Sequence, residues 1–67
     1  MISVKLNSKE KWIKKGSSVS DLLKFIDLKK DGIVVEINLN IIKKDRYEDT
    51  ILKSGDSVEI ITFMGGG

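Results

Sequence analysis

The last three residues, Gly65-Gly66-Gly67, are the part of the sequence best suited to chemistry. Glycine has no Cβ, so this run lets the backbone enter a narrow slot, and it spans about 10 Å when extended. The carboxyl group of Gly67 is ionised at neutral pH, and a carboxylate is a poor electrophile. Acyl chemistry at Gly67 therefore requires prior activation, for example as a phosphoric anhydride. The alternative interpretation is a frayed tail without a role.

The residue types that are missing narrow the chemistry further. The sequence contains no Cys and no His, so it offers no thiol nucleophile, no zinc–thiolate site and no imidazole base. Ser, Asp, Glu and Lys leave catalysis formally open. We nevertheless expect a chain that binds no cofactor and on which other proteins act.

Length and composition predict one small globular domain. A chain of 67 residues buries only about 60% of its unfolded surface, which leaves little room for an enclosed active site. No apolar run approaches the roughly 18 residues of a membrane span, and no secretory signal is evident. The net charge of +2 comes from dispersed lysines, unlike a clustered nucleic-acid-binding face. We expect a cytoplasmic protein, monomeric when free, with neither membrane nor nucleic acid as partner.

Several segments must position the glycine run. Apolar residues alternate with polar ones in residues 2–7, 33–38 and 57–63, a period typical of half-buried strands. Residues 10–15 predict a second strand, paired with the first as a hairpin. Residues 41–42 predict a short edge strand, followed by a polar connection with a turn or one helical turn.

One helix is expected between the second and third strands. Ser18 and Asp21 fit a capping box at its start, and we expect its end within residues 29–32, at Gly32. The apolar stripe has helical spacing and consists of Val19, Leu22, Leu23 and Ile26, widened by Phe25 and Leu28.

These elements predict an α+β fold of the β-grasp (ubiquitin-like) type. We expect residues 1–64 to form the domain, with a mixed sheet of four to five strands and one main helix, and residues 65–67 to form a flexible tail. The last strand should pair with the first. The sheet residues expected beneath the helix are Ile2, Val4, Leu6, Ile33, Val35, Ile37, Val58 and Ile60.

A docking patch is predicted on the sheet face away from the helix. If Glu59 faces water, then Ile61 and Phe63 share its face, together with Val34. The alternative is that Phe63 folds over the sheet edge and Ile61 joins a minor apolar cluster. Trp12 is ambiguous between packing and docking, and packing is the more common role for such a residue.

The sequence resembles the ThiS sulfur carrier family. The resemblance covers nearly the whole chain and is carried by Asp21-Leu22-Leu23, Val34-Val35-Glu36-Ile37-Asn38, Arg46-Tyr47 and residues 52–67, which include a Gly-Asp turn, an apolar last strand and terminal glycines. The chain departs from the family at Leu39, where a small or polar residue is usual, and at Gly65, which replaces a small apolar residue. Arg46 and Tyr47 are expected to pin the long connection.

The resemblance implies that this chain is a substrate rather than a catalyst. An E1-like adenylating enzyme would use ATP and Mg²⁺ to activate the Gly67 carboxylate, while Gly65 and Gly66 thread its active site. Sulfur from a cysteine desulfurase relay would replace AMP, leaving a thiocarboxylate that thiazole synthase consumes. The rivals are a molybdopterin-synthase small subunit, disfavoured by the absence of Pro, a protein modifier, and a TGS-like binding module.

Overall fold

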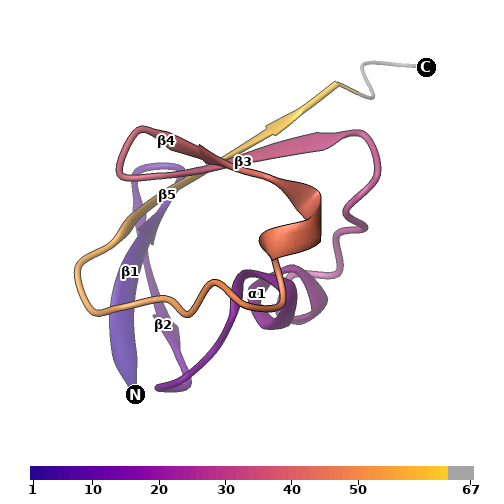
Figure 1. Ribbon diagram of the computed structural model, residues 1–67. Coiled ribbons are helices and arrows are strands. Elements are labelled where there is room, and N and C mark those ends of the chain that lie inside the picture. Colours follow the sequence, from indigo (N-terminus) through magenta and orange to yellow (C-terminus); the bar gives the residue numbers. More distant parts are fainter. Residues whose placement is uncertain (64–67) are drawn as a thin grey trace.

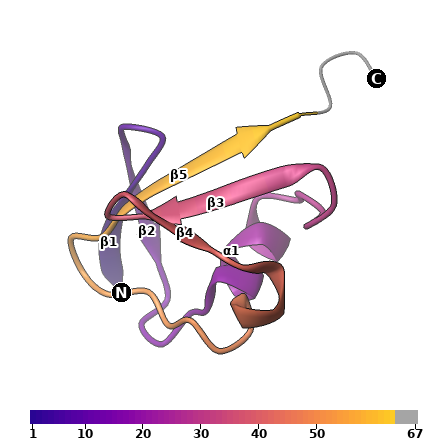
Figure 2. The ribbon, with the colours of Figure 1, turned by 45° about the horizontal axis from the view of Figure 1, so that its top comes forward.

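The structure is a computed structural model that describes residues 1–63, in which one helix packs against a mixed five-stranded sheet (Figures 1 and 2). The elements are β1 (Ile2–Leu6), β2 (Lys9–Ile13), α1 (Val19–Phe25), β3 (Ile33–Ile37), β4 (Asn40–Ile42), the 3₁₀ turn η1 (Lys44–Arg46) and β5 (Ser57–Thr62). The strand order is β2-β1-β5-β3-β4. Among the strands of residues 1–63, only β1 and β5 run parallel to each other, and this pairing confirms the predicted β-grasp arrangement.

The alternating strands place one apolar face of the sheet against α1. In β3, for example, Ile33, Val35 and Ile37 are buried, whereas Val34 and Glu36 are only half-buried on the opposite face. The predicted core is confirmed, with Ile2 and Leu6 partly buried at its margin. The second and last strands are shorter than expected, since β2 ends at Ile13 and β5 at Thr62.

The start of α1 follows the predicted capping box. The Ser18 hydroxyl accepts a hydrogen bond from the Asp21 N–H (3.1 Å), and the Asp21 carboxylate accepts one from the Ser18 N–H (3.0 Å). Hydrogen bonding to the Asp21 carboxylate, first by the Ser18 backbone N–H and then by the Ser18 side chain, lowers the pKa of Asp21. The helix therefore begins with two of its free N–H groups satisfied.

The predicted end of the helix is wrong. Asp27 takes a positive φ of 59°, and the Leu28 N–H reaches back to the Leu23 carbonyl at 2.8 Å. This is a Schellman closure with Asp where Gly is usual, and it stops α1 at Phe25, before the predicted range 29–32. Phe25 is exposed rather than part of the apolar stripe.

The connection between β4 and β5 is held by the core rather than by regular structure. Tyr47 is buried with Leu52 among the largest core side chains, and burial raises the pKa of its phenol. The side chain of Arg46 is exposed, while its carbonyl accepts the Thr50 N–H (3.0 Å) and hydroxyl (2.7 Å). Both residues thus pin the connection, Tyr47 by packing and Arg46 through its backbone.

The β3–β4 hairpin contains a strained position. Ile37 pairs with Asn40, so Asn38 and Leu39 form a two-residue turn, with φ values of 51° and 72°. Asn tolerates a positive φ, whereas Leu pays a steric cost there. The Leu39 side chain is 88% exposed, so in the isolated chain little packing offsets that cost.

Leu39→Gly should stabilise the fold by about 0.5–1 kcal/mol, because Gly adopts the turn conformation without strain. The corresponding rise in Tm is about 2–8 °C for a domain of this size. Leu39→Ala is the control, since it removes the exposed side chain but keeps a Cβ at positive φ. Thermal unfolding that shifts equally for both variants would show that the backbone of Leu39 is unstrained.

Candidate functional site

The strand β5 is the last element described before the C-terminal glycines in the sequence. Its residues Val58 and Ile60 are buried in the core, and it lies between β1 and β3. The last described contact is a hydrogen bond from the Phe63 N–H to the Gly32 carbonyl (2.8 Å). The predicted reactive and threading residues, Gly65, Gly66 and Gly67, lie outside the described residues.

A side chain from the first hairpin extends the pairing of β5. The regular β1–β5 ladder ends at Leu6 and Val58. Beyond it, the Asn7 side chain accepts the Ile60 N–H at 2.7 Å and donates to the Ile60 carbonyl at 3.2 Å. The side-chain amide of Asn7 thus bonds to the N–H and carbonyl of Ile60 as the backbone of a neighbouring strand would. Among residues 1–63, β5 beyond Ile60 is paired only with β3.

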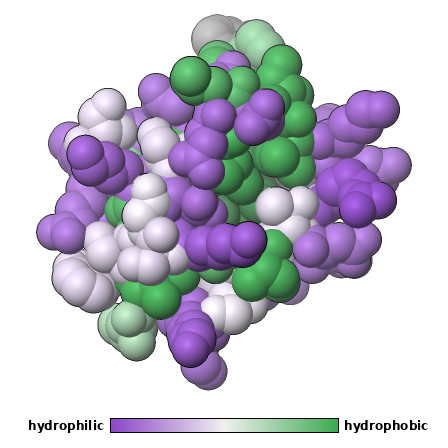
Figure 3. Space-filling view, turned by 60° about the vertical axis from the view of Figure 1, so that its left-hand side comes forward, coloured by the Kyte–Doolittle hydropathy of each residue, from purple (hydrophilic) through white to green (hydrophobic). Residues whose placement is uncertain are grey.

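The predicted patch residues come together on the sheet face opposite α1. Val34 and Ile61 are directly opposite each other in the β3–β5 pair. Ile61 is 44% exposed, and Phe63, just past the strand, is 68% exposed. We call Val34, Ile61 and Phe63 the docking patch. A view from the left-hand side of Figure 1 shows apolar side chains gathered in the upper part of this face (Figure 3).

Acidic side chains lie next to the docking patch. Glu36 and Glu59 are opposite each other on the same face, two residues along the β3–β5 ladder from Val34 and Ile61. Like charges in this position destabilise a strand pair. A cationic group of a partner protein would relieve the repulsion between the two carboxylates. This face therefore suits a partner whose surface is apolar in the middle and basic at its margin.

The other predicted residues do not join this site. The exposure of Phe63 argues against its folding over the sheet edge. Trp12 lies on β2, separated from β5 by β1, and its exposed ring shows that the packing interpretation was wrong. Within residues 1–63 no acidic cluster is arranged to hold a metal ion, and no helix in that range is long and apolar enough to cross a bilayer.

The sequence interpretation missed the polar contacts that fix both ends of β5. Asn7 falls at the end of the first predicted strand, and the sequence pattern gives no sign that its side-chain amide bonds to Ile60. At the other end, the side-chain Oδ1 of Asn38 accepts a hydrogen bond from the Ser57 N–H (3.0 Å), and its side-chain Nδ2 donates one to the Asp56 carboxylate (3.1 Å). The available signal was an Asn at each of two turns, which does not reveal a partner far along the chain.

Comparisons with known proteins agree with the fold and with the resemblance. The sequence matches the profile of the ThiS family over residues 3–67. It is 40% identical over 65 residues to the sulfur carrier protein ThiS of Bacillus subtilis, covering 96% of this chain and 98% of that one. A thiazole synthase of Paramagnetospirillum magneticum is 32% identical over 62 residues, which are 92% of this chain and 19% of that protein.

A solved structure extends the likeness to three dimensions. The crystal structure of the thiamine biosynthesis protein ThiS from Geobacter metallireducens superposes with a TM-score of 0.83 at 28% identity, covering 98% of this chain and all of the other. The five-stranded β-grasp sheet, the single α-helix of the described residues and a family match that extends to the glycines lead to one conclusion: the chain belongs to the ThiS family.

Proposed function

We propose that this chain is a sulfur carrier for formation of the thiazole moiety of thiamine, and that the Gly67 carboxyl group carries the sulfur. The observation that supports this most is the placement of β5, whose buried residues anchor it while its last residues reach the sheet margin beside an exposed apolar patch. The absence of Cys and His from the sequence leaves the terminal acyl group as the place for reactive sulfur. The chain is thus a protein substrate and not an enzyme.

The first step is activation by an E1-like adenylating enzyme. A Gly67 carboxylate oxygen attacks the α-phosphorus of ATP and displaces pyrophosphate, which leaves an acyl-adenylate. ATP and Mg²⁺ bind to the adenylating enzyme and not to this chain. The two preceding glycines, Gly65 and Gly66, have no side chains and fit a narrow channel that leads to the nucleotide.

The second step loads sulfur, and the third delivers it. The terminal sulfur of a persulfide, drawn from cysteine through the desulfurase relay, attacks the acyl carbon, and AMP leaves. A thiol reductant then cleaves the S–S bond of the resulting acyl disulfide and is itself oxidised to a disulfide. The resulting thiocarboxylate transfers its sulfur to the thiazole that thiazole synthase builds, which regenerates the carboxylate. All of these partners work in the cytoplasm in this proposal.

One comparison supports thiazole synthase as a partner. The thiazole synthase of Paramagnetospirillum magneticum contains a stretch similar to this chain, which makes up 19% of its length. Two activities joined in one polypeptide in one organism are good candidates for partners as separate chains in another. The names of the similar proteins also favour the thiamine pathway over the molybdopterin alternative.

The docking patch and the acidic pair beside it define how the adenylating enzyme would hold the carrier. Burying Ile61 and Phe63 against an apolar surface would supply the main free energy of binding. Basic side chains of the enzyme would pair with Glu36 and Glu59 and so set the orientation. This contact positions β5 such that Gly67 reaches the nucleotide.

Ile61→Lys should weaken binding to the adenylating enzyme about 10-fold or more, since it places a charge in the apolar centre of the docking patch. Its long aliphatic stem and its nearness to Glu36 and Glu59 should keep the fold intact. Ile51→Lys is the matched control, because Ile51 is 50% exposed and lies outside β5. Calorimetric titration measures both affinities. Equal binding of the two variants would remove Ile61 from the interface, and loss of folding by Ile61→Lys would place it in the core.

Adding one residue after Gly67 should abolish ATP–pyrophosphate exchange by the adenylating enzyme, because the acyl carbon that reacts is no longer at the end of the chain. The same residue added before Met1 should leave the exchange rate unchanged. Binding of the extended carrier to the enzyme is measured alongside. If the extended chain supports exchange at the normal rate, the proposed role of the Gly67 carboxylate is wrong, and a binding module that needs no free terminus fits better.

A further inference from the structure

The edge strand β2 has backbone groups that no other described strand uses. On β1, Ser3 and Lys5 direct their backbone groups away from β2. The Ser3 carbonyl accepts a hydrogen bond from the Gly55 N–H (2.8 Å), and the Lys5 N–H donates one to the Asp56 carbonyl (2.8 Å), both in the turn just before β5. The alternate residues of β1 therefore bond to β2. In an antiparallel pair, this leaves the backbone N–H and C=O groups of every second residue of β2 pointing away from β1, toward the open edge of the sheet. These residues are Glu10 and Trp12, which pair with Lys5 and Ser3 without exchanging backbone hydrogen bonds.

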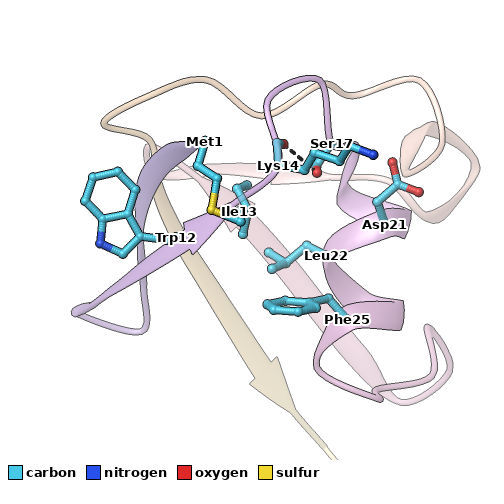
Figure 4. A pocket seen from close by; sticks show the side chains of 8 residues that line it. All are labelled: Met1, Trp12, Ile13, Lys14, Ser17, Asp21, Leu22 and Phe25. Atoms are coloured by element: carbon cyan, nitrogen blue, oxygen red, sulfur yellow. Dashed lines mark hydrogen bonds between the residues drawn. The ribbon is translucent and has the colours of Figure 1, made fainter.

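An apolar groove runs between this edge and α1. Its volume is about 460 Å³, and its apolar lining includes Ile13 from β2 and Leu22 and Phe25 from α1. Figure 4 shows the side chains of Leu22 and Phe25 directed from the helix toward Ile13. Phe25, the last residue of α1, is exposed and absent from the core, so the groove contains an aromatic surface that the core does not use.

Lysines predominate along the β2 side of the groove, where Glu10 is the one acidic residue between Lys9 and Lys15. Lys9, Lys11, Lys14 and Lys15 lie on β2 or just after it, and the Lys11 ammonium lies 5.0 Å from the centre of the Phe25 ring. The nearest acidic side chain of the lining, Asp21, is already bonded to the Ser18 N–H. The groove therefore favours a ligand with acidic residues.

The same lysines argue against a second copy of this chain at the edge. Antiparallel self-pairing of β2 centred on Lys11 would place that residue opposite itself and repeat a strand rich in lysine. Like charges directly opposite destabilise a strand pair, and lysines on an edge are a known device against self-association. An acidic strand from a different protein would not place lysine opposite lysine.

We propose that the groove between β2 and α1 binds an extended acidic segment of a partner protein, which adds to β2 as a further strand. Its backbone pairs with the outward groups of Glu10 and Trp12, and its alternate apolar side chains enter the groove against Phe25. Acidic residues at its ends pair with the surrounding lysines. The inference is independent of the sulfur chemistry, since β1 separates β2 from β5 and the docking patch is on the opposite face of the sheet.

The probe for this groove is a synthetic peptide of alternating valine and threonine with an Asp-Glu pair at each end, acetylated and amidated. Titration into ¹⁵N-labelled protein should shift the amide signals of β2 and α1 and leave those of the docking patch unchanged. The same peptide with Lys-Arg pairs at its ends should bind about 5-fold or more weakly, because charge complementarity is lost.

A matched pair of variants tests strand addition itself. Glu10→Pro removes an outward N–H, and proline is tolerated on an edge strand when its nitrogen faces solvent. Glu10→Ala removes the same side chain but keeps the N–H. The acidic peptide should bind Glu10→Pro about 10-fold or more weakly than Glu10→Ala. If Glu10→Pro does not fold, N-methylation of alternate peptide residues makes the same test from the ligand side, with the same expected loss.

Three results would overturn the inference. The first is no amide shift in β2 and α1 at millimolar acidic peptide. The second is equal affinity for the acidic and basic peptides. The third is equal affinity of the two Glu10 variants or, where that pair is unusable, of the N-methylated and unmethylated peptides. Each result leaves the proposed role of Gly67 untouched, because the carrier function is measured by adenylation.

Discussion

The pairing of β5 between β1 and β3 is the constraint on which the rest of the structure depends. Val58 and Ile60 tie the strand to the core, while the side chains of Asn7 and Asn38 hold its backbone near each end. Because alternate residues of a strand point to opposite faces, the burial of Ile60 places Ile61 on the outer face. One packing arrangement thus fixes both the course of the chain up to Phe63 and the exposed surface beside it.

The fold keeps its two sheet faces for different tasks. The face beneath α1 supplies the apolar burial that a chain of this size needs. The outer face retains features that cost stability in isolation, namely exposed Ile61 and Phe63 and the opposed carboxylates Glu36 and Glu59. Such costs are typical of surfaces that are completed by a partner. The strained turn at Leu39 and the exposed ring of Phe25, in other parts of the molecule, also cost stability in the isolated chain.

Much of this architecture could be predicted from the sequence, because alternating apolar residues and the Ser18–Asp21 box are local signals. The end of α1 could not, since a positive φ at Asp27 is a weak preference that depends on the closing bond to Leu23. The hydrogen bonds of the Asn7 side chain could not be predicted either, because its partner Ile60 lies 53 residues away in the sequence. For the site, the shared face of Val34, Ile61 and Phe63 followed from the strand period, whereas the opposition of Glu36 and Glu59 required the register.

The central claim is that the Gly67 carboxyl group accepts sulfur while the rest of the chain stays unchanged. Intact-mass and fragment mass spectrometry tests it after incubation with ATP, Mg²⁺, the cognate adenylating enzyme and a sulfur source. The account predicts a mass increase equal to the replacement of one oxygen by sulfur, localised to Gly67. An unchanged mass, in a reaction whose enzyme loads a known carrier, would contradict it.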